Sequence, residues 1–501
     1  MGLFRASGGL RHAPRRARRL TRSSATRVLL WAAILLGTAA RVFTLVVRPL
    51  WADEIFTLTL ARKSLPEMLA ALRVDSGPPL HYLASHVLLL PFPSPGAGDA
   101  VVRLFSLAAS LLHLPLLILL GRRLGRAGTG LAAAALYALF PLAVLYGVEG
   151  RGYALASLLA LLAFERALAL RERPRLGTGA ALALCAGGAV LTHYLAVFPV
   201  AALALLAIDE RPASRRALVL AGLAAAALAA PWVPVALHQP AASMAWAREP
   251  AFSGALRDFP ANLAFGVEQA GGFALPLAFL GGALLLALLL RERRGVLSPV
   301  AAVLSGSLVL LALAQFATGA LVLPGRTAVV FLPLVALLLA SAPAAVPLAA
   351  GTLAAVFLGR ALTDVAGPSP GETLARLLET PARAGKAIVA VGYWGPELDY
   401  RLARAGVPGH VVFFPAAVAA HPGWYREEEI PDETLRAEAE ALLAAPPHPY
   451  VFVLPRGSRA SAALASRLGP ARRLLASPLV DVVEKKGHLP NPAIRENLPS
   501  G

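Results

Sequence analysis

Long apolar runs, separated by short polar segments, fill most of the first 360 residues. A run of about 18 residues or more is long enough to cross a bilayer as a helix. We place the spanning helices at about 28–47, 101–120, 128–146, 152–170, 177–193, 194–208, 216–236, 272–290, 296–317, 326–341 and 343–360. The pattern therefore predicts a polytopic α-helical membrane domain over residues 28–360, with about eleven spans.

The segment between the first two runs, residues 48–100, contains two shorter apolar stretches at about 54–72 and 79–91. The second stretch is too short to span comfortably, and prolines at its end close it. We expect both stretches to form helices that lie on the membrane surface within an external loop.

Arginine-rich segments decide the orientation of the chain. Residues 1–27 carry eight Arg and no acid. With the spans given above, the other strongly basic loops fall on the same side as this segment, at 121–126, 171–173, 211–216 and 291–294. The positive-inside rule makes that side cytoplasmic. We therefore expect a multi-pass protein of the cell (inner) membrane with a cytoplasmic N-terminus and an extracytoplasmic C-terminal region.

The pattern changes at about residue 361. Short β-rich runs alternate from there with helical patterns, the runs at 387–391, 411–414, 450–454 and 479–483 and the helices near 396–406, 432–444 and 459–468. This alternation predicts a small extracytoplasmic α/β domain over residues 361–501 with a partly parallel sheet. The segment 392–395 is not a glycine-rich phosphate loop, so no nucleotide signature is present.

The composition agrees with a membrane protein and removes other classes. Of 501 residues, 57% are hydrophobic and 15% are charged, which is too little charge to cover a soluble protein of this size. The single cysteine, Cys185, lies in an apolar run, which excludes a disulfide framework and a zinc site. The net charge of +18 belongs to residues 1–360, where basic residues punctuate the apolar runs. We therefore expect no nucleic-acid partner.

Polar clusters fall on the predicted outer face, at helix ends or in the adjoining loops. They contain Asp53, Glu54, Asp75, His81, Tyr82, Glu149, Arg151, Tyr153, His193, Tyr194 and Arg326. Ionisable residues at a membrane boundary are functional candidates. Carboxylates serve as general bases or metal ligands, and arginines hold phosphate through paired hydrogen bonds. Together these residue types suit a reaction at a lipid phosphate, with the attacking hydroxyl arriving from outside.

Each cluster also has a structural interpretation, which the sequence leaves open. The Asp53-Glu54 pair suits a solvated helix end. Asp75 is placed to cap the helix that follows it. Glu149 and Arg151 suit a local ion pair at a helix end. Arg326 suits an interfacial anchor, and His193 with Tyr194 suits packing in an interface belt.

The outer-face motifs also occur in a characteristic order. They are Trp51-Ala52-Asp53-Glu54, Asp75-Ser76-Gly77-Pro78-Pro79-Leu80-His81-Tyr82, Tyr146-Gly147-Val148-Glu149-Gly150-Arg151-Gly152-Tyr153-Ala154-Leu155, Thr192-His193-Tyr194, and Arg326 followed by Leu332-Pro333. In this order they resemble the GT-C membrane glycosyltransferases, in particular glycosyltransferase family 39. Its bacterial relatives include protein O-mannosyltransferases and the aminoarabinose transferase of lipid A. The family's histidine before Pro-Pro is Gly77 here, so its role is absent or moved to His81.

The resemblance implies a polyprenyl-phosphate-linked sugar donor and an extracytoplasmic acceptor that is a lipid, a glycan or a protein. Asp53 would deprotonate the acceptor, and the reaction would invert the anomeric carbon. Glu54 would orient the acceptor or share a cation. Arg151 and Arg326 would hold the phosphate, and Asp75, His81, Tyr82, Glu149, Tyr153, His193 and Tyr194 would complete the substrate site. No cofactor is required; a divalent metal ion held by Asp53 and Glu149 is compatible with the resemblance.

Other functions remain open at this point. A flippase or transporter of lipid-linked sugars would show mid-membrane polar residues and internal repeats, and we find no convincing repeat. A polymerase or ligase of lipid-linked glycans would share the donor chemistry. A catalytically inactive scaffold would use its external domain to bind a partner, although the intact Asp53-Glu54 pair argues against it.

Overall fold

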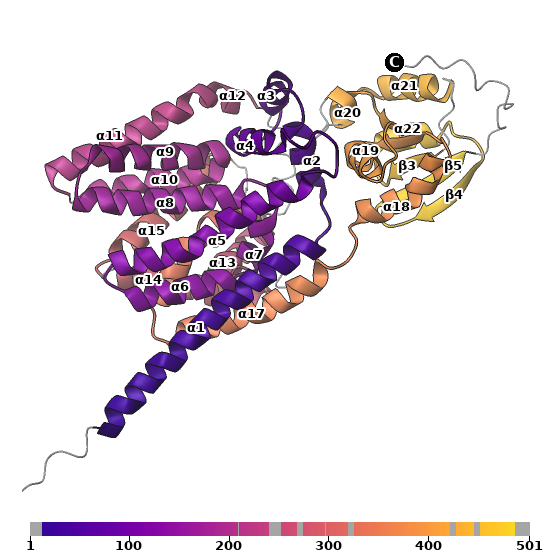
Figure 1. The fold of residues 1–501 in the computed structure, drawn as a ribbon. Helices are drawn as coiled ribbons and strands as arrows, with labels where there is room; N and C mark the ends of the chain where they lie inside the picture. The colour runs from indigo at the N-terminus through magenta and orange to yellow at the C-terminus, as the bar shows by residue number, and fades with distance from the viewer. Residues whose placement is uncertain are drawn as a thin grey trace, which may run out of the picture.

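A helical bundle and an α/β domain make up the protein (Figure 1). The computed structural model describes residues 13–208, 210–239, 252–267, 274–295, 297–318, 325–420, 427–444 and 451–485. The long helix α1 (Ala13–Val47) runs along one side of the bundle, and α17 (Ala345–Asp364) is the last helix of the bundle in the sequence. The α/β domain follows α17 and lies at the end of the bundle where α2 is found.

Within the described residues, seven helices are long and apolar enough to cross a membrane. They are α1, α5 (Asp99–Arg123), α8 (Tyr153–Glu172), the segment of α11 (Pro212–Ala229), η3 (Ala230–Trp232) and α12 (Val233–His238), α14 (Ala274–Glu292), α15 (Ser298–Thr318) and α17. The broken pair α6 (Ala127–Leu139) and α7 (Pro141–Val148) counts as an eighth span if taken together. The predicted polytopic helical fold class is confirmed.

The count of eleven spans stays a prediction. Its remaining members are shorter than the others: α9 (Leu176–Thr192), the segment from η1 (Tyr194–Ala196) through α10 (Val197–Ala202) to η2 (Leu203–Ala207), and α16 (Leu332–Ala340). All residues of α16 are buried, as expected for a helix that is apolar on every side. Side chains such as Leu286, Leu313 and Phe316 are instead exposed on the outside of the bundle, where lipid would cover them.

The break between α6 and α7 bends the chain by 67°. Pro141 has no N–H to donate to the carbonyl of Tyr137, and the N–H of Leu142 donates to Gly266 instead of Ala138. Arg41 of α1, which is fully buried, donates to both freed carbonyls, at 3.3 Å for Tyr137 and 2.7 Å for Ala138. The arginine inside the first apolar run therefore faces the interior and stabilises the bend.

Three short helices lie at the end of the bundle nearest the α/β domain (Figure 1). They are α2 (Ala52–Ala61), α3 (Leu65–Arg73) and α4 (Leu80–Leu89). The predicted first stretch, 54–72, is therefore two helices. Ser64 separates them because its N–H donates to the carboxylate of Glu67, 3.0 Å away, as in a capping box.

The C-terminal part is a five-stranded sheet with the strand order β2-β1-β3-β5-β4. Strands β2 (Val411–Phe414), β1 (Ile388–Val391) and β3 (Val451–Pro455) are parallel, and β5 (Val480–Lys485) and β4 (Ala471–Ala476) are antiparallel to their neighbours. Helices α18 (Pro370–Arg383) and α19 (Trp394–Arg404) pack on one face. Helices α21 (Asp432–Ala444) and α22 (Arg459–Ala465) pack on the other. Two short elements, α20 (Ala417–Ala420) and η7 (Glu427–Glu429), complete the domain.

Candidate active site

Asp53 lies in the first turn of α2, and its side chain is 35% exposed. Its Oδ2 atom is 3.1 Å from Nη1 of Arg326. Arg326 belongs to η6 (Gly325–Val330), which precedes the last two helices of the bundle in the sequence. The structure thus brings together two candidates that are 273 positions apart. A partly exposed carboxylate beside a guanidinium is accessible to a ligand from solvent.

Glu54, the next residue, is buried and faces the interior. Arg103 of α5 binds both of its oxygens, with Nε at 2.7 Å and Nη2 at 2.5 Å. The N–H of Gly150 also donates to Glu54, at 2.9 Å. Both carboxylate oxygens accept hydrogen bonds from protein donors. Glu54 therefore joins α2 to α5 and to the turn between α7 and α8.

That turn carries Glu149 and Arg151. Oε2 of Glu149 is 3.2 Å from Nη1 of Arg48, while Oε1 is buried and has no hydrogen-bond partner among the residues that the structure describes. Burial raises the pKa of Glu149, as do the carboxylates of Glu54 and Asp53, and the Arg48 guanidinium opposes the shift. A side chain at Gly152 would come 2.9 Å from the carbonyl of Thr192, so the tight turn requires glycine.

Arg151 connects the turn to two surface helices. Its Nη1 atom donates to the hydroxyl of Tyr82 at 2.9 Å, to Oγ1 of Thr57 at 3.2 Å and to the carbonyl of Asp53 at 3.4 Å. Its guanidinium also lies over the Tyr82 ring. Burial raises the pKa of Tyr82, so its hydroxyl stays protonated at neutral pH.

Trp51 stands between two further arginines. The guanidinium groups of Arg48 and Arg326 lie 5.8 and 5.9 Å from its ring centroid. Its Nε1 atom is buried and, within the described part of the chain, has no hydrogen-bond partner. Three arginines, Arg48, Arg151 and Arg326, therefore surround Trp51 and Asp53, which makes this a favourable place for an anion.

His81 is buried against the same turn rather than exposed. Burial lowers its pKa to about 4, so the ring is neutral and Nε2–H donates to the carbonyl of Gly150 at 3.2 Å. Asp75 is buried close to Tyr82: a Cβ atom placed on Gly77 would lie within 3.5 Å of both side chains. These candidates therefore lie next to the Arg151–Tyr82 pair.

Two candidates from the end of α9 have different neighbours. The Tyr194 hydroxyl donates to Gln239 at 2.8 Å and accepts from Nε1 of Trp232 at 2.9 Å. Gln239 in turn donates to the carbonyl of Gly77. His193 accepts the N–H of Leu195 and packs against the ring of Tyr153, 5.2 Å away between centroids. Tyr194 thus fixes the loop that carries Asp75, while Tyr153 and His193 form an aromatic contact.

Arg48, Arg103 and Trp51 also belong to this site, although no sequence pattern singled them out as site residues. Arg103 carried a signal, because it is an ionisable residue at the start of a predicted span and such residues have specific partners. Its partner is the Glu54 carboxylate. Trp51 stood inside the quoted motif but gave no indication that two arginines would flank its ring.

A divalent cation held by Asp53 and Glu149 stays a prediction. Asp53 and Glu149 each have an arginine within 3.2 Å. Across the described ranges, no three His, Cys, Asp or Glu side chains come together as a metal site requires. The guanidinium groups supply the positive charge in this arrangement.

Part of the chain matches a known family, and the fold is similar to that of solved structures. Residues 76–234 match the family described as dolichyl-phosphate-mannose-protein mannosyltransferase. No protein with a curated description matches the chain. The fold is similar to ArnT from Cupriavidus metallidurans bound to undecaprenyl phosphate, with a TM-score of 0.57, 17% identity, and coverage of 93% of this chain and 99% of that one. The apo state of ArnT matches with a TM-score of 0.57, 16% identity, and coverage of 93% and 98%.

A weaker likeness, with a TM-score of 0.47 and 13% identity, is to the archaeal oligosaccharyltransferase AglB from Archaeoglobus fulgidus, over 85% of this chain and 69% of that one. The resemblance to the GT-C membrane glycosyltransferases is confirmed by the family match and the ArnT-like fold.

Proposed function

We propose that this protein transfers a monosaccharide from a polyprenyl-phosphate-linked donor to an acceptor outside the cytoplasm, with inversion and with Asp53 as the general base. The observation that carries the proposal is the accessible Asp53 carboxylate among Arg48, Arg151 and Arg326. A transferase of this kind needs a base for the acceptor and positive charge for a departing lipid phosphate. The ArnT structure that shares this fold holds undecaprenyl phosphate, which supports the lipid class of the donor.

In the proposed step, Asp53 takes the proton of the acceptor hydroxyl while its oxygen attacks the anomeric carbon. The bond from that carbon to the phosphate oxygen breaks on the opposite face, and the electron pair leaves with the polyprenyl phosphate. Arg326 now pairs with Asp53. The donor phosphate would take this guanidinium over, which frees the carboxylate to act as a base and stabilises charge where it develops.

The remaining groups have separate roles in this proposal. Glu54 is a positioning residue, because Arg103 and Gly150 bind its oxygens. The unpaired Oε1 of Glu149 and Nε1 of Trp51 are buried polar atoms that lack partners in the described chain. Each such atom needs an explanation, and one acceptor and one donor at this place suit sugar hydroxyls. No step requires a metal ion.

A flippase is the second candidate function, and the same experiment separates it. Membranes from cells lacking the gene, which contain donor and acceptor, receive wild type, Asp53→Asn or the control Asp364→Asn. Asp364 is an exposed acid at the C-terminal end of α17. We expect wild type and the control to move labelled sugar out of the polyprenyl-phosphate pool and Asp53→Asn to be slower by roughly 10²–10⁴-fold.

The labelled product would identify the acceptor. Full activity of Asp53→Asn would remove Asp53 from the mechanism. If the amount of labelled polyprenyl-phosphate donor is the same in membranes with wild type and in membranes without the protein, transfer is contradicted. An assay of labelled-lipid translocation would then test the flippase.

A further inference from the structure

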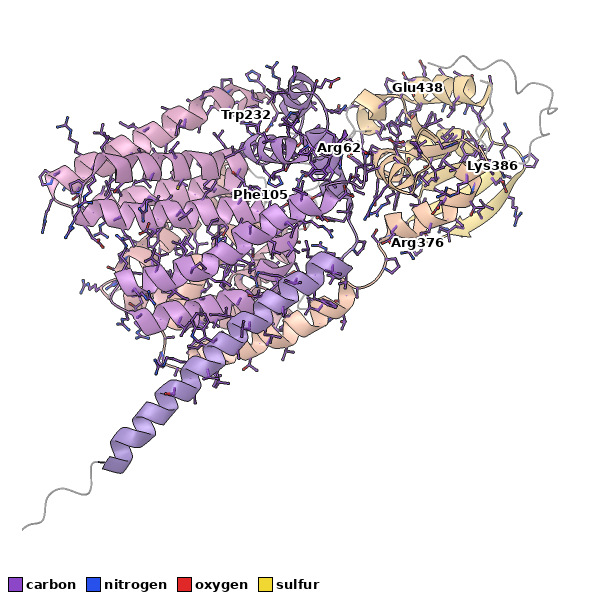
Figure 2. All side chains as sticks on the ribbon, viewed as in Figure 1. Arg62, Phe105, Trp232, Arg376, Lys386 and Glu438 are labelled. Atoms are coloured by element: carbon purple, nitrogen blue, oxygen red, sulfur yellow. The ribbon has the colours of Figure 1, made fainter. Side chains whose placement is uncertain are left out.

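Helix α19 of the α/β domain meets both ends of the helix that carries Asp53. Consecutive residues of α19, Tyr400 and Arg401, make these contacts, and α19 packs along α2. Arg62, the residue that ends α2, lies on the side of the bundle that faces this domain (Figure 2). No motif indicates a role for the C-terminal domain, and these contacts suggest one.

The first contact is at the start of α2. Nη2 of Arg401 donates to the carbonyl of Leu50 at 2.5 Å, one residue before Trp51 caps the helix. The Arg401 side chain is almost fully buried. Its own domain holds it in place, through Glu397 one turn earlier and through the hydroxyl of Ser369. Contacts within its own domain therefore hold the guanidinium in place, so it has little freedom to follow a shift of α2.

The second contact is at the end of α2. The Tyr400 hydroxyl donates to the carboxylate of Asp99, and Nη1 of Arg62 donates to the Tyr400 oxygen at 3.1 Å. Nη2 of Arg62 also lies 3.3 Å from the Asp99 carboxylate. The three side chains connect the end of α2, the start of α5 and α19. The Tyr400 ring packs with Leu50 and with apolar residues of α2 in one cluster.

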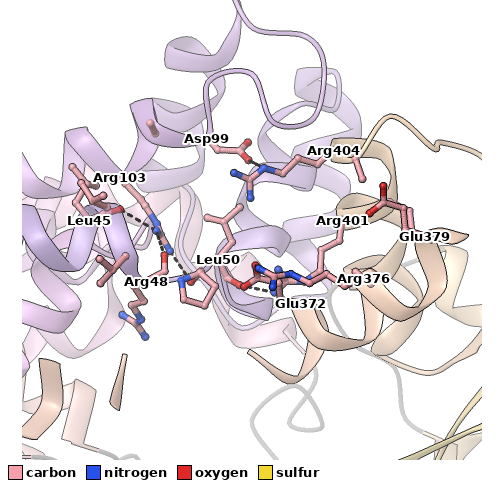
Figure 3. Close-up of a pocket in the computed structure, with 17 residues that line it drawn as sticks. Leu45, Arg48, Leu50, Asp99, Arg103, Glu372, Arg376, Glu379, Arg401 and Arg404 are labelled. Atoms are coloured by element: carbon pink, nitrogen blue, oxygen red, sulfur yellow. Dashed lines mark hydrogen bonds and ion pairs between the residues drawn. The ribbon is translucent and has the colours of Figure 1, made fainter. Parts of the chain in front are cut away.

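These hydrogen bonds accompany the packing of α19 along α2. Beside them lies a cavity of about 440 Å³ between α1, α5, α18 and α19 (Figure 3). In that view Arg401 reaches toward Leu50, and Arg404 reaches toward Asp99. The domain thus contacts the start of α2 through Arg401 and the end of α2 through Tyr400.

We propose that the C-terminal domain positions the general base: Tyr400 and Arg401 fix the two ends of α2 and so hold Asp53 at its distance from the arginines. This inference rests on the proposed function. Catalysis depends on such placement, since a shift of about 1 Å can reduce a rate by about 10²-fold. Neither residue touches substrate in this proposal, so both are positioning residues.

The test compares full-length Arg401→Gln, Arg401→Lys and Tyr400→Phe with the control Arg383→Gln. Arg383 is a matched control because it also pairs with a glutamate one turn earlier and donates to a backbone carbonyl, but both partners belong to its own domain. We expect kcat for sugar transfer to fall about tenfold or more in Arg401→Gln and Tyr400→Phe, with the KM for donor within about twofold of wild type. Arg401→Lys should recover part of the loss, and the control should match wild type.

Hydrogen exchange of the α2 amides provides a readout that does not need transfer. Arg401→Gln and Tyr400→Phe should exchange faster over 54–61 than wild type and Arg383→Gln, while β1 and β3 keep their protection. Unchanged kcat per folded protein, or unchanged exchange in α2, would overturn the proposal. If Asp53→Asn stays active, the base assignment fails while the exchange experiment still decides whether α19 fixes α2.

Discussion

Two neighbouring carboxylates, Asp53 and Glu54, have different surroundings because they are adjacent on a helix. Successive residues of an α-helix differ by about 100° around its axis. Asp53 therefore faces Arg326, and Glu54 faces Arg103. The sequence identified both acids but not this division, because the partner of Glu54 lies within an apolar run. Glu54 was expected to orient the acceptor or share a cation, and the structure instead places it against protein donors.

The buried Glu54–Arg103 pair should contribute to the stability of the fold. Glu54→Gln removes the negative charge from a buried pair and leaves the Arg103 guanidinium without a counter-charge. Breaking such a pair costs roughly 3–5 kcal/mol. We expect a clearly lower thermal unfolding midpoint in detergent. The matched control is Glu372→Gln, which removes the partner of Arg376 from a partly exposed pair; exposed pairs are worth about 0.2–1 kcal/mol. Equal midpoints for both variants would contradict a structural role for Glu54.

At the scale of elements, the bend between α6 and α7 determines where the turn with Glu149 and Arg151 lies. Pro141 breaks the helix, and Arg41 replaces the missing donors. The same guanidinium donates to the hydroxyl of Ser110 at 2.9 Å, which joins α5 to the bend. A buried arginine without a carboxylate partner in the described structure is thus explained by backbone carbonyls that the proline leaves free.

Replacement of Arg41 should therefore destabilise the bundle more than its charge alone suggests. Arg41→Met keeps a long apolar side chain but leaves the carbonyls of Tyr137 and Ala138 without donors, and each unsatisfied buried group costs about 1–3 kcal/mol. We expect faster thermal inactivation and less folded protein. Arg175→Met, at an exposed position, should behave like wild type. A stable Arg41→Met variant with normal activity would show that the bend does not need this donor.

The elements were predictable where hydropathy decides them and less so elsewhere. Apolar runs located the long helices, and alternation of β-rich and helical runs located β1, β2, β3 and β5. The runs did not reveal the break at Ser64, because the apolar pattern continues across it. Helix α18 was missed because its charged residues mask a one-sided apolar face. The edge strand β4 was missed because its exposed arginines interrupt the run.

For the whole molecule, the candidate site depends on contacts that no local pattern contains. Asp53 is held by Arg326 from late in the chain, and Leu50 by Arg401 from the C-terminal domain. The motif order indicated that the clusters share one face. It did not indicate which of them touch, since that depends on the packing of α2 between the bundle and α19.

The Arg401–Leu50 contact also places Asp53 and the C-terminal domain on the same side of the bundle. We propose that this side is extracytoplasmic, because the arginine-rich loops lie at the opposite helix ends. Single cysteines at Gly367 and Gly177, in a Cys185→Ala background, test the orientation. Both glycines are exposed with open space for a side chain.

An impermeant maleimide should label Gly367→Cys on intact cells, while Gly177→Cys should react only after permeabilisation. Reaction after permeabilisation is the control for thiol accessibility. Labelling of Gly177→Cys on intact cells, with Gly367→Cys protected, would reverse the orientation. Asp53 would then face the cytoplasm, and an extracytoplasmic acceptor would be impossible.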